Sequence, residues 1–207
     1  MTRLLLVRHG TSEYNSIRRF AGHSDIDLTP LGYKQAEKLR DRLAGEKIDI
    51  IYCSDLKRAA MTASIISSRH QVETVVCPEL RELNYGDIEG LSYEEIKSRY
   101  PETAELIATR DITLNFPNGE SINDLITREH RFLERLSREA PAQNILIVAH
   151  SGPLQMLVCH LIGIEHRHWW QIRFDNASLS IIDTYPPGAI ITVLNDTSHL
   201  KDIDKNA

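Results

Sequence analysis

Three short apolar runs constrain this chain of 207 residues more than any other feature of its sequence. They cover residues 4–7, 48–53 and 145–149, are rich in Leu, Ile and Val, and end at polar or turn residues. Continuous apolar runs of this length are typical of strands that are buried on both faces of a sheet. The segments between them have helical period, and this alternation predicts a mostly parallel sheet flanked by helices.

Local signals extend this prediction along the chain. Thr29 and Pro30 suit an N-cap and a first helical residue, and Asp55 is placed to introduce a helix in the same way. The expected helices cover residues 30–43, 56–68, 92–100, 121–139 and 153–162, and further strands are expected near 74–76 and at 178–184 and 190–194. The last two strands, separated by a Pro-Pro-Gly turn, would add an antiparallel edge. We therefore expect an α/β fold, a three-layer sandwich with a mixed sheet, in which residues 1–207 form a single domain.

Composition excludes several classes of function. The net charge of −5 argues against a general affinity for nucleic acid or for an anionic membrane. The three cysteines are odd in number, far apart and form no C-x-x-C pair, so reduced thiols are expected instead of disulfides or a thiolate metal site. No run approaches the roughly 20 apolar residues that span a membrane, and the first run is too short for a signal peptide. A cytoplasmic location is expected.

Charged and nucleophilic side chains follow the expected strands. Arg8 and His9 come directly after the first strand, Arg58 lies about one helical turn past the second, and His150 follows the third. Ligands of open α/β sheets bind beyond the carboxyl ends of the strands, so these residues are expected to meet at one edge. Two guanidinium groups and two imidazoles make a site for a tetrahedral dianion such as phosphate.

Such a site has the parts that phosphoryl transfer needs. Arg8, Arg58 and one imidazolium can place positive charge against the phosphate oxygens without a metal ion. The other imidazole can be the nucleophile, and the neighbouring arginines should favour its neutral form. A leaving alkoxide also needs a proton, and Glu79, Glu82 and Glu89 in the stretch PELRELNYGDIEG are candidate donors. Spacing alone does not choose between them.

The segment LLLVRHGTSEYN resembles the signature of the histidine phosphatase superfamily, which includes the cofactor-dependent phosphoglycerate mutases. The Arg-His-Gly tripeptide follows an apolar strand, and Asn15 stands at the family's spacing. Further blocks similar to the family occur in family order at residues 20–22, 27–30, 54–59, 79–82, 86–90, 119–121 and 148–152.

The resemblance implies a role for each matching residue. His9 would be the phosphohistidine nucleophile and Glu82 the proton donor, while Arg8, Arg58 and His150 would bind the phosphoryl group. The residues expected to contact the substrate are Gly10, Asn15, Ala21, Gly22 and Ser151. The resemblance implies no metal and no other cofactor, and the expected partner is a small phosphorylated substrate. A homodimer is a possible assembly.

Departures from the family pattern concern the leaving-group side of the pocket. Thr11, Ile88 and Ser151 replace the usual family residues, and none of them removes a catalytic side chain. The short stretch between residues 90 and 121 favours a phosphatase over a phosphoglycerate mutase. The segment 117–121 resembles small bacterial phosphatases of the alpha-ribazole phosphatase group, so alpha-ribazole 5'-phosphate is the candidate substrate. A mutase and a non-catalytic phosphate-binding module are the alternatives.

Two further groups near the C-terminus have ordinary explanations. His166-x-His168 can chelate a metal, and His160 lies nearby, but no carboxylate or cysteine shows ligand spacing. We therefore expect exposed or core-edge histidines there. Trp169 and Trp170 could stack on a substrate ring, but packing onto the sheet is the expected role.

Overall fold

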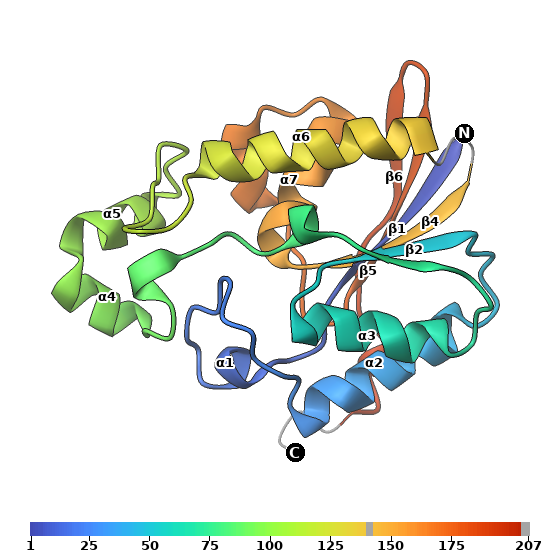
Figure 1. The fold of residues 1–207 in the computed structure, drawn as a ribbon, viewed down its shortest axis with the longest axis horizontal. Coiled ribbons are helices and arrows are strands. Elements are labelled where there is room, and N and C mark those ends of the chain that lie inside the picture. The colour runs from blue at the N-terminus through green and yellow to red at the C-terminus, as the bar shows by residue number, and fades with distance from the viewer. Residues whose placement is uncertain (140–142, 204–207) are drawn as a thin grey trace.

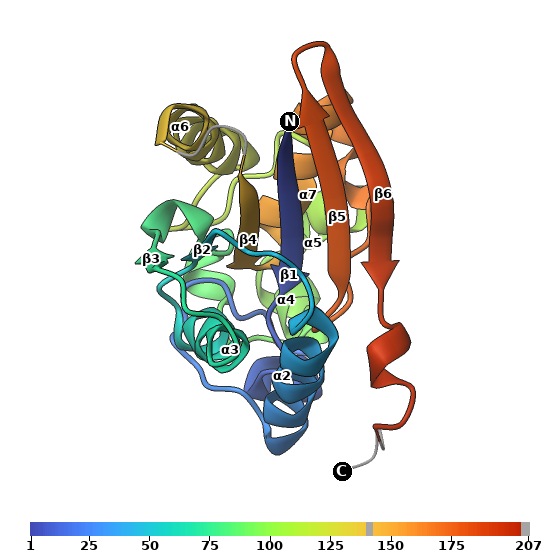
Figure 2. The ribbon, with the colours of Figure 1, turned by 90° about the vertical axis from the view of Figure 1, so that its right-hand side faces the viewer.

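The computed structural model describes residues 1–139 and 143–203, and its centre is a six-stranded sheet in the order β3-β2-β4-β1-β5-β6 (Figure 2). The strands are β1 (Thr2–Arg8), β2 (Ile50–Cys53), β3 (Thr74–Val76), β4 (Asn144–Ala149), β5 (Leu179–Tyr185) and β6 (Gly188–Asp196). β1 to β4 run parallel to one another, whereas β5 is antiparallel to β1 and forms a hairpin with β6. This arrangement confirms the mixed α/β sheet and its antiparallel edge.

Helices cover both faces of the sheet (Figure 1). The helices are α1 (Glu13–Ser16), α2 (Pro30–Leu43), α3 (Lys57–Ser67), α4 (Tyr93–Arg99), α5 (Pro101–Thr109), α6 (Ile122–Glu139) and α7 (Ser151–Ile162). The described residues also form the short 3-10 segments η1 (Pro78–Leu80), η2 (Gly86–Ile88), η3 (His166–Gln171) and η4 (Ser198–Leu200). Successive residues of a strand point to opposite faces, so Leu4 and Leu6 pack under α6 and α7, and Leu5 and Val7 pack under α2 and α3.

A third apolar cluster lies beyond the sheet, where α4 and α5 stand apart from it at one end of the molecule (Figure 1). Helix α5 was not expected from the sequence. Pro101 is its first residue, and Tyr100 before it ends α4 with a non-helical backbone (φ −135°, ψ 62°), because a following proline disfavours the helical conformation in its predecessor. The cluster includes the buried side chains of Ile88, Ile96 and Phe116. Residues 86–122 thereby form a wall at the carboxyl end of the strands.

Helix starts show where local signals succeed and where they fail. The Thr29 hydroxyl accepts a hydrogen bond from the Gly32 N–H at 3.1 Å, which confirms its role as N-cap of α2. The prediction for Asp55 was wrong, because Leu56 is the N-cap of α3 and the Asp55 carboxylate instead accepts from Arg81 Nε at 2.8 Å. Helix α7 begins at Ser151, two residues earlier than expected, because a proline is tolerated in the first turn of a helix.

Candidate active site

The register of β1 and β4 brings the two histidines together. Arg8 pairs with Ala149 across these parallel strands, and each strand is followed by a histidine. The His9 N–H donates to the Ala149 carbonyl at 3.0 Å, and the ring centroids of His9 and His150 lie 4.9 Å apart. His9 and His150 are 141 positions apart in the sequence (150 − 9), yet they share one site.

His9 is held in one tautomer. Its Nδ1 lies 2.7 Å from the Gly10 carbonyl oxygen, which can only accept a hydrogen bond, so Nδ1 carries the proton. Nε2 therefore keeps its lone pair. Burial, and then the charges of Arg58 and Arg8, lower the pKa of His9 well below its ordinary value. The ring is neutral at pH 7, and burial contributes more to this than the arginines that the sequence pointed to.

Arg58 enters the site from the first turn of α3 and is almost fully buried. Its Nη2 donates to the Gly22 carbonyl at 2.7 Å, and its Nη1 donates to the Ser24 carbonyl at 2.8 Å. Its Nε donates to Nδ1 of His150 at 3.2 Å. Burial lowers the pKa of Arg58 and nearby Glu82 opposes this, but a guanidinium stays charged in proteins. The structure therefore fixes a positive charge beside both histidines.

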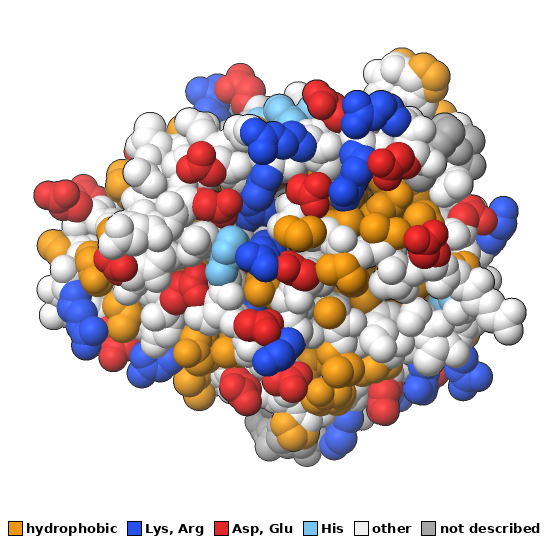
Figure 3. All heavy atoms as spheres, in the orientation of Figure 1, with side chains coloured by type: hydrophobic (Ala, Val, Ile, Leu, Met, Phe, Trp, Pro, Cys, Tyr) orange, Lys and Arg blue, Asp and Glu red, His pale blue; other side chains and the backbone are white. Residues whose placement is uncertain are grey.

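Arg8 retains an unused donor at the site. Its Nη1 donates to the Phe174 carbonyl at 2.6 Å, while its Nε is buried and has no hydrogen-bond partner among the described residues. A buried guanidinium donor is stabilised when an anion accepts from it. Acidic and basic side chains are interspersed over the face of the molecule in Figure 3, so attraction of an anion depends on such local charges.

His150 lies beside His9 and is completely buried. Because its Nδ1 accepts from Arg58, Nε2 carries the proton of the neutral ring and donates to the Ser54 hydroxyl oxygen at 2.9 Å. Burial and the charge of Arg58 hold the pKa of His150 well below its ordinary value. Both ring nitrogens are engaged in this arrangement. Contact with a phosphate therefore requires His150 to exchange one of these partners.

A cavity of about 260 Å³ lies at this edge of the sheet, and seven of the ten residues expected at the site line it. The seven are Arg8, His9, Asn15, Ala21, Arg58, Glu82 and Ser151. His150, Gly10 and Gly22 do not line the cavity but contact residues that do, and His150 accepts from Arg58. The carbonyls of Gly10 and Gly22 orient His9 and Arg58, respectively.

Sequence reasoning missed four residues of the cavity wall, namely Arg18, Arg19, Phe20 and Tyr85. The adjacent pair of arginines was a visible signal, since basic residues near a phosphate site attract its ligand. Arg19 Nη1 is engaged by the Glu95 carboxylate at 2.7 Å, whereas Arg18 is exposed and has a left-handed backbone with φ of 55°. Burial strongly raises the pKa of Tyr85, so its hydroxyl keeps its proton and can donate to an oxygen.

Of the three candidate proton donors, only Glu82 lines the cavity. Its Oε1 accepts from the N–H of Leu83 at 2.9 Å and from the N–H of Gly152 at 3.1 Å. Glu79 instead forms an ion pair with Arg135 at 3.2 Å. The Glu89 carboxylate accepts from the backbone of the loop at residues 23–24, and this loop supplies a carbonyl to Arg58. The geometry thus distinguishes three carboxylates that spacing left equivalent.

The backbone that carries Glu82 is itself tied down. Arg128 on α6 donates from Nη2 to the Glu82 carbonyl at 2.8 Å, and His23 Nε2 lies 2.9 Å from the same oxygen. Arg128 is also paired with the Glu120 carboxylate through Nε at 3.0 Å. These bonds join α6 and the wall of residues 86–122 to the candidate acid.

A second cavity of about 290 Å³ adjoins the first, because Glu82, Tyr85 and Ser151 line both. Trp169 and Trp170 of η3 are part of its wall. Trp169 packs against the core clusters, as expected for both tryptophans, but the expectation was wrong for Trp170, which is half exposed. The tryptophans therefore have a place beside the candidate acid that sequence reasoning did not assign.

The fold and the cavity define an α/β protein in which two arginines and two histidines gather at the carboxyl ends of the strands. The family model of the histidine phosphatase superfamily (branch 1) matches residues 4–197, and the chain belongs to that superfamily. The chain is 34% identical to phosphoserine phosphatase 1 of Hydrogenobacter thermophilus, over 97% of this chain and 95% of that protein. It is 35% identical to the adenosylcobalamin/alpha-ribazole phosphatase of Escherichia coli, over 93% and 95% of the two chains.

A solved structure agrees with this assignment. The crystal structure of the alpha-ribazole phosphatase from Shigella flexneri superposes with a TM-score of 0.88 at 34% identity, covering 94% of this chain and 96% of that chain. Because the chain belongs to this superfamily and is similar to these phosphatases, the protein is a phosphatase acting on small phosphorylated substrates. In the described part of the chain, none of the helices has the length and apolarity to cross a bilayer.

Proposed function

We propose that the protein hydrolyses a phosphomonoester through a phosphohistidine on His9, without a metal ion. The observation that carries this proposal is the hydrogen bond from His9 Nδ1 to the Gly10 carbonyl. It leaves the lone pair on Nε2 of a neutral ring, in a cavity that also contains Arg8 and Arg58. A neutral imidazole beside two fixed positive charges is the arrangement that nucleophilic attack on a phosphate dianion requires.

In the first step Nε2 of His9 attacks phosphorus, and the bond between phosphorus and the ester oxygen breaks. Glu82, in its acid form, gives its proton to the departing oxygen, which leaves as an alcohol. Arg8 and Arg58 stabilise the charge on the phosphoryl oxygens. The negative charge of the bound group also favours a protonated His150, which would then donate to it. The product of this step is a phosphohistidine.

In the second step a water molecule replaces the alcohol. The Glu82 carboxylate takes a proton from this water as its oxygen attacks phosphorus, and the bond between Nε2 and phosphorus breaks. Inorganic phosphate and neutral His9 result, and Glu82 is again in its acid form. One residue thus serves as acid and then as base, as microscopic reversibility allows.

Alpha-ribazole 5'-phosphate is the substrate that we propose first. The cavity beside Glu82 is walled by the two tryptophans and by apolar side chains that include Ile122, Leu125 and Met156. Flat aromatic surfaces suit a planar heterocycle on the leaving group. The similarity to enzymes named alpha-ribazole phosphatase supports the same choice.

Phosphoserine is the second candidate, favoured by the similar phosphoserine phosphatase of Hydrogenobacter thermophilus. Arg110 lines the second cavity and offers a guanidinium to a carboxylate there. The ratio of kcat/KM for alpha-ribazole 5'-phosphate and phosphoserine would decide between the two. Phosphoryl exchange on phosphoglycerate that depends on a bisphosphate primer would instead indicate a mutase.

The chemistry is tested with an aryl phosphate in the presence of a strong chelator. Wild-type protein should hydrolyse the aryl phosphate under these conditions. Brief mixing with labelled substrate should trap an acid-labile phosphoenzyme. His9→Ala should lower kcat by more than about 10³-fold and abolish the trapped species, with an unchanged circular dichroism spectrum. Loss of wild-type activity on chelation would contradict the metal-free mechanism, and a phosphoenzyme in His9→Ala would place the nucleophile elsewhere.

A further inference from the structure

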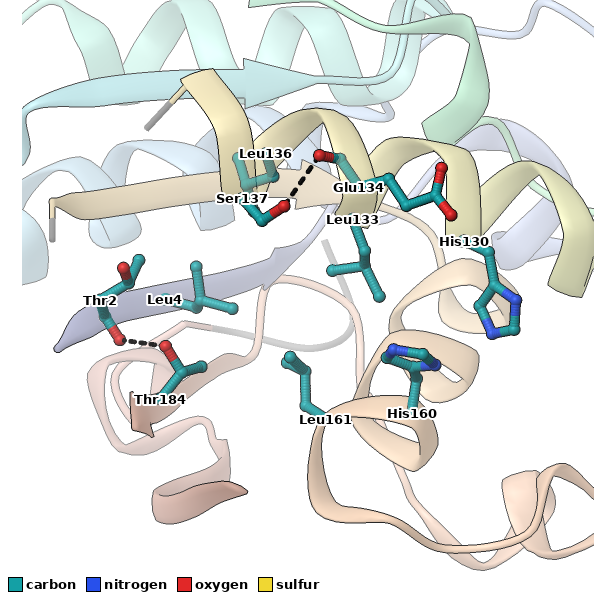
Figure 4. A pocket seen from close by; sticks show the side chains of 10 residues that line it. All are labelled: Thr2, Leu4, His130, Leu133, Glu134, Leu136, Ser137, His160, Leu161 and Thr184. Atoms are coloured by element: carbon teal, nitrogen blue, oxygen red, sulfur yellow. Dashed lines mark hydrogen bonds between the residues drawn. The ribbon is translucent and has the colours of Figure 1, made fainter. Parts of the chain in front are cut away.

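Three histidines that line neither of the two cavities at the candidate site gather between three elements of the fold. His130 projects from α6, His160 from α7 and His166 from η3, and one ligand atom of each lies within 4.8 Å of the others. The ring centroids of His130 and His160 are 4.5 Å apart. Figure 4 shows these two rings at one end of a cavity of about 580 Å³, opposite Thr2 and Thr184.

The histidine cluster has unused ligand atoms. Nε2 of His130 and Nε2 of His166 are buried, and neither has a hydrogen-bond partner in residues 1–139 and 143–203. A buried polar atom without a partner costs free energy, which a ligand would recover. Burial, followed by the neighbouring imidazoles, lowers the pKa of His160 and of His166. Neutral imidazole is the form that binds a metal.

We propose that His130, His160 and His166 bind a divalent transition-metal cation, with Zn²⁺ as the natural probe. Imidazole nitrogen suits Zn²⁺, Co²⁺, Ni²⁺ and Cu²⁺, whereas Mg²⁺ and Ca²⁺ prefer oxygen ligands. A Zn–N distance of about 2.1 Å places tetrahedral ligand atoms about 3.4 Å apart, so the side chains must draw together slightly. His160 is exposed, which gives it room to move and gives the cation a route from solvent.

The sequence allows His166-x-His168 as a chelating pair but predicts ordinary exposed or core-edge histidines. In the structure His168 is engaged elsewhere, because its Nε2 accepts from Arg167 Nε at 3.3 Å and its Nδ1 lies 3.2 Å from Gln171 Nε2. His130, 36 positions before His166 by the difference 166 − 130, takes its place in the cluster. A metal ion bound by the three histidines would link η3 to α6 and α7. His168 lies on η3 but is not part of the cluster, so it provides a matched control.

Isothermal titration of the full chain with ZnCl₂ tests the proposal. Wild-type protein should bind one equivalent, and His160→Ala should weaken binding at least tenfold, while His168→Ala and His9→Ala leave it unchanged. Co²⁺ should give visible absorption bands of tetrahedral intensity in wild type and not in His160→Ala. MgCl₂ should give no binding.

A second measurement, of the melting temperature, distinguishes loss of metal binding from loss of folding. Zn²⁺ should raise the melting temperature of wild type and of His168→Ala. It should not change the melting temperature of His160→Ala or of His166→Ala. The proposal is overturned if His160→Ala and His166→Ala both bind as wild type does. It is also overturned if wild type binds no Zn²⁺, or if only His9→Ala removes binding, which would assign the metal to the catalytic histidines.

Discussion

His9 and His150 stand directly after residues that face each other across two parallel strands, and this register sets their ring centroids 4.9 Å apart. Neither ring has to be brought into place by a flexible loop. The sheet that carries the core therefore also fixes the distance between the proposed nucleophile and its neighbour. Changes that shift β4 against β1 by one residue would separate the two rings, because side chains of a strand alternate between faces.

The role of Glu82 can be tested with leaving groups of different basicity. Glu82→Gln cannot donate a proton to an alkoxide, so kcat for an alkyl phosphate should fall by about a hundredfold or more. p-Nitrophenolate leaves without protonation, so the first step with p-nitrophenyl phosphate should be affected far less. Burst kinetics separate this step from hydrolysis of the phosphoenzyme. An equal loss in the first step for both substrates would contradict the proposed role.

Gly152 lies so close to Glu82 that a side chain there should disturb it. A Cβ atom on Gly152 would meet the Glu82 carboxylate, whose Oε1 accepts from the Gly152 N–H. Gly152→Ala should therefore lower kcat on alkyl phosphates by about tenfold or more. Gly45→Ala is the matched control, because a Cβ there meets nothing within 4 Å. Equal rates for both variants would show that this contact is not needed.

The two buried histidines of the candidate site should make stability fall in acid. The pKa values of His9 and His150 lie well below the ordinary value, so both rings stay neutral in the fold while histidines of the unfolded chain take up protons below about pH 6.5. The free energy of unfolding should drop by up to about 1.4 kcal/mol per pH unit for each ring. Urea denaturation between pH 7.5 and 5.5 measures this.

His9→Asn provides the comparison for this measurement. The variant should lose stability less steeply over the same pH range, since one of the two rings is gone. Identical slopes for wild type and variant would mean that His9 is protonated in the folded protein.

Glu129 should have the opposite pH dependence. This side chain of α6 is completely buried, its carboxylate has no hydrogen-bond partner in the described part of the chain, and burial raises its pKa to about 9. The folded protein keeps the proton that the unfolded chain loses above about pH 4.5. Stability therefore falls as pH rises toward 9. The free energy of unfolding of Glu129→Gln minus that of wild type should therefore increase between pH 6 and 8, by up to about 1.4 kcal/mol per pH unit.

Urea denaturation at pH 6 and pH 8 checks the prediction for Glu129. Glu134→Gln, at an exposed position five residues further along α6, should show no such trend. A difference between Glu129→Gln and wild type that stays constant with pH would show that Glu129 is ionised in the fold.

The sequence predicted the parts of the fold and site that depend on short-range pattern. Arg8, His9 and His150 could be assigned because a polar residue after a buried apolar run marks the carboxyl end of a strand. Arg58 could be placed because the helix after β2 begins close to it. The sequence also predicted α2 from its cap at Thr29.

Other features depend on contacts between distant segments, which spacing does not reveal. Glu82 differs from Glu79 and Glu89 because it lines the cavity, where the Gly152 N–H of α7 contacts it, whereas Glu79 pairs with Arg135 of α6. His130 joins the histidine cluster only because α6 packs on α7. Asp55 misled the prediction of a cap because a longer-range ion pair with Arg81 competes for the same carboxylate.

Glu82 belongs to the wall between two cavities, and this position has a kinetic consequence for the proposed reaction. The two halves of a cleaved ester would lie in different compartments, so the alcohol can diffuse away while phosphorus is still bonded to His9. Release of products is then ordered, with the alcohol first and inorganic phosphate last. Free phosphate would compete with the substrate for the empty enzyme.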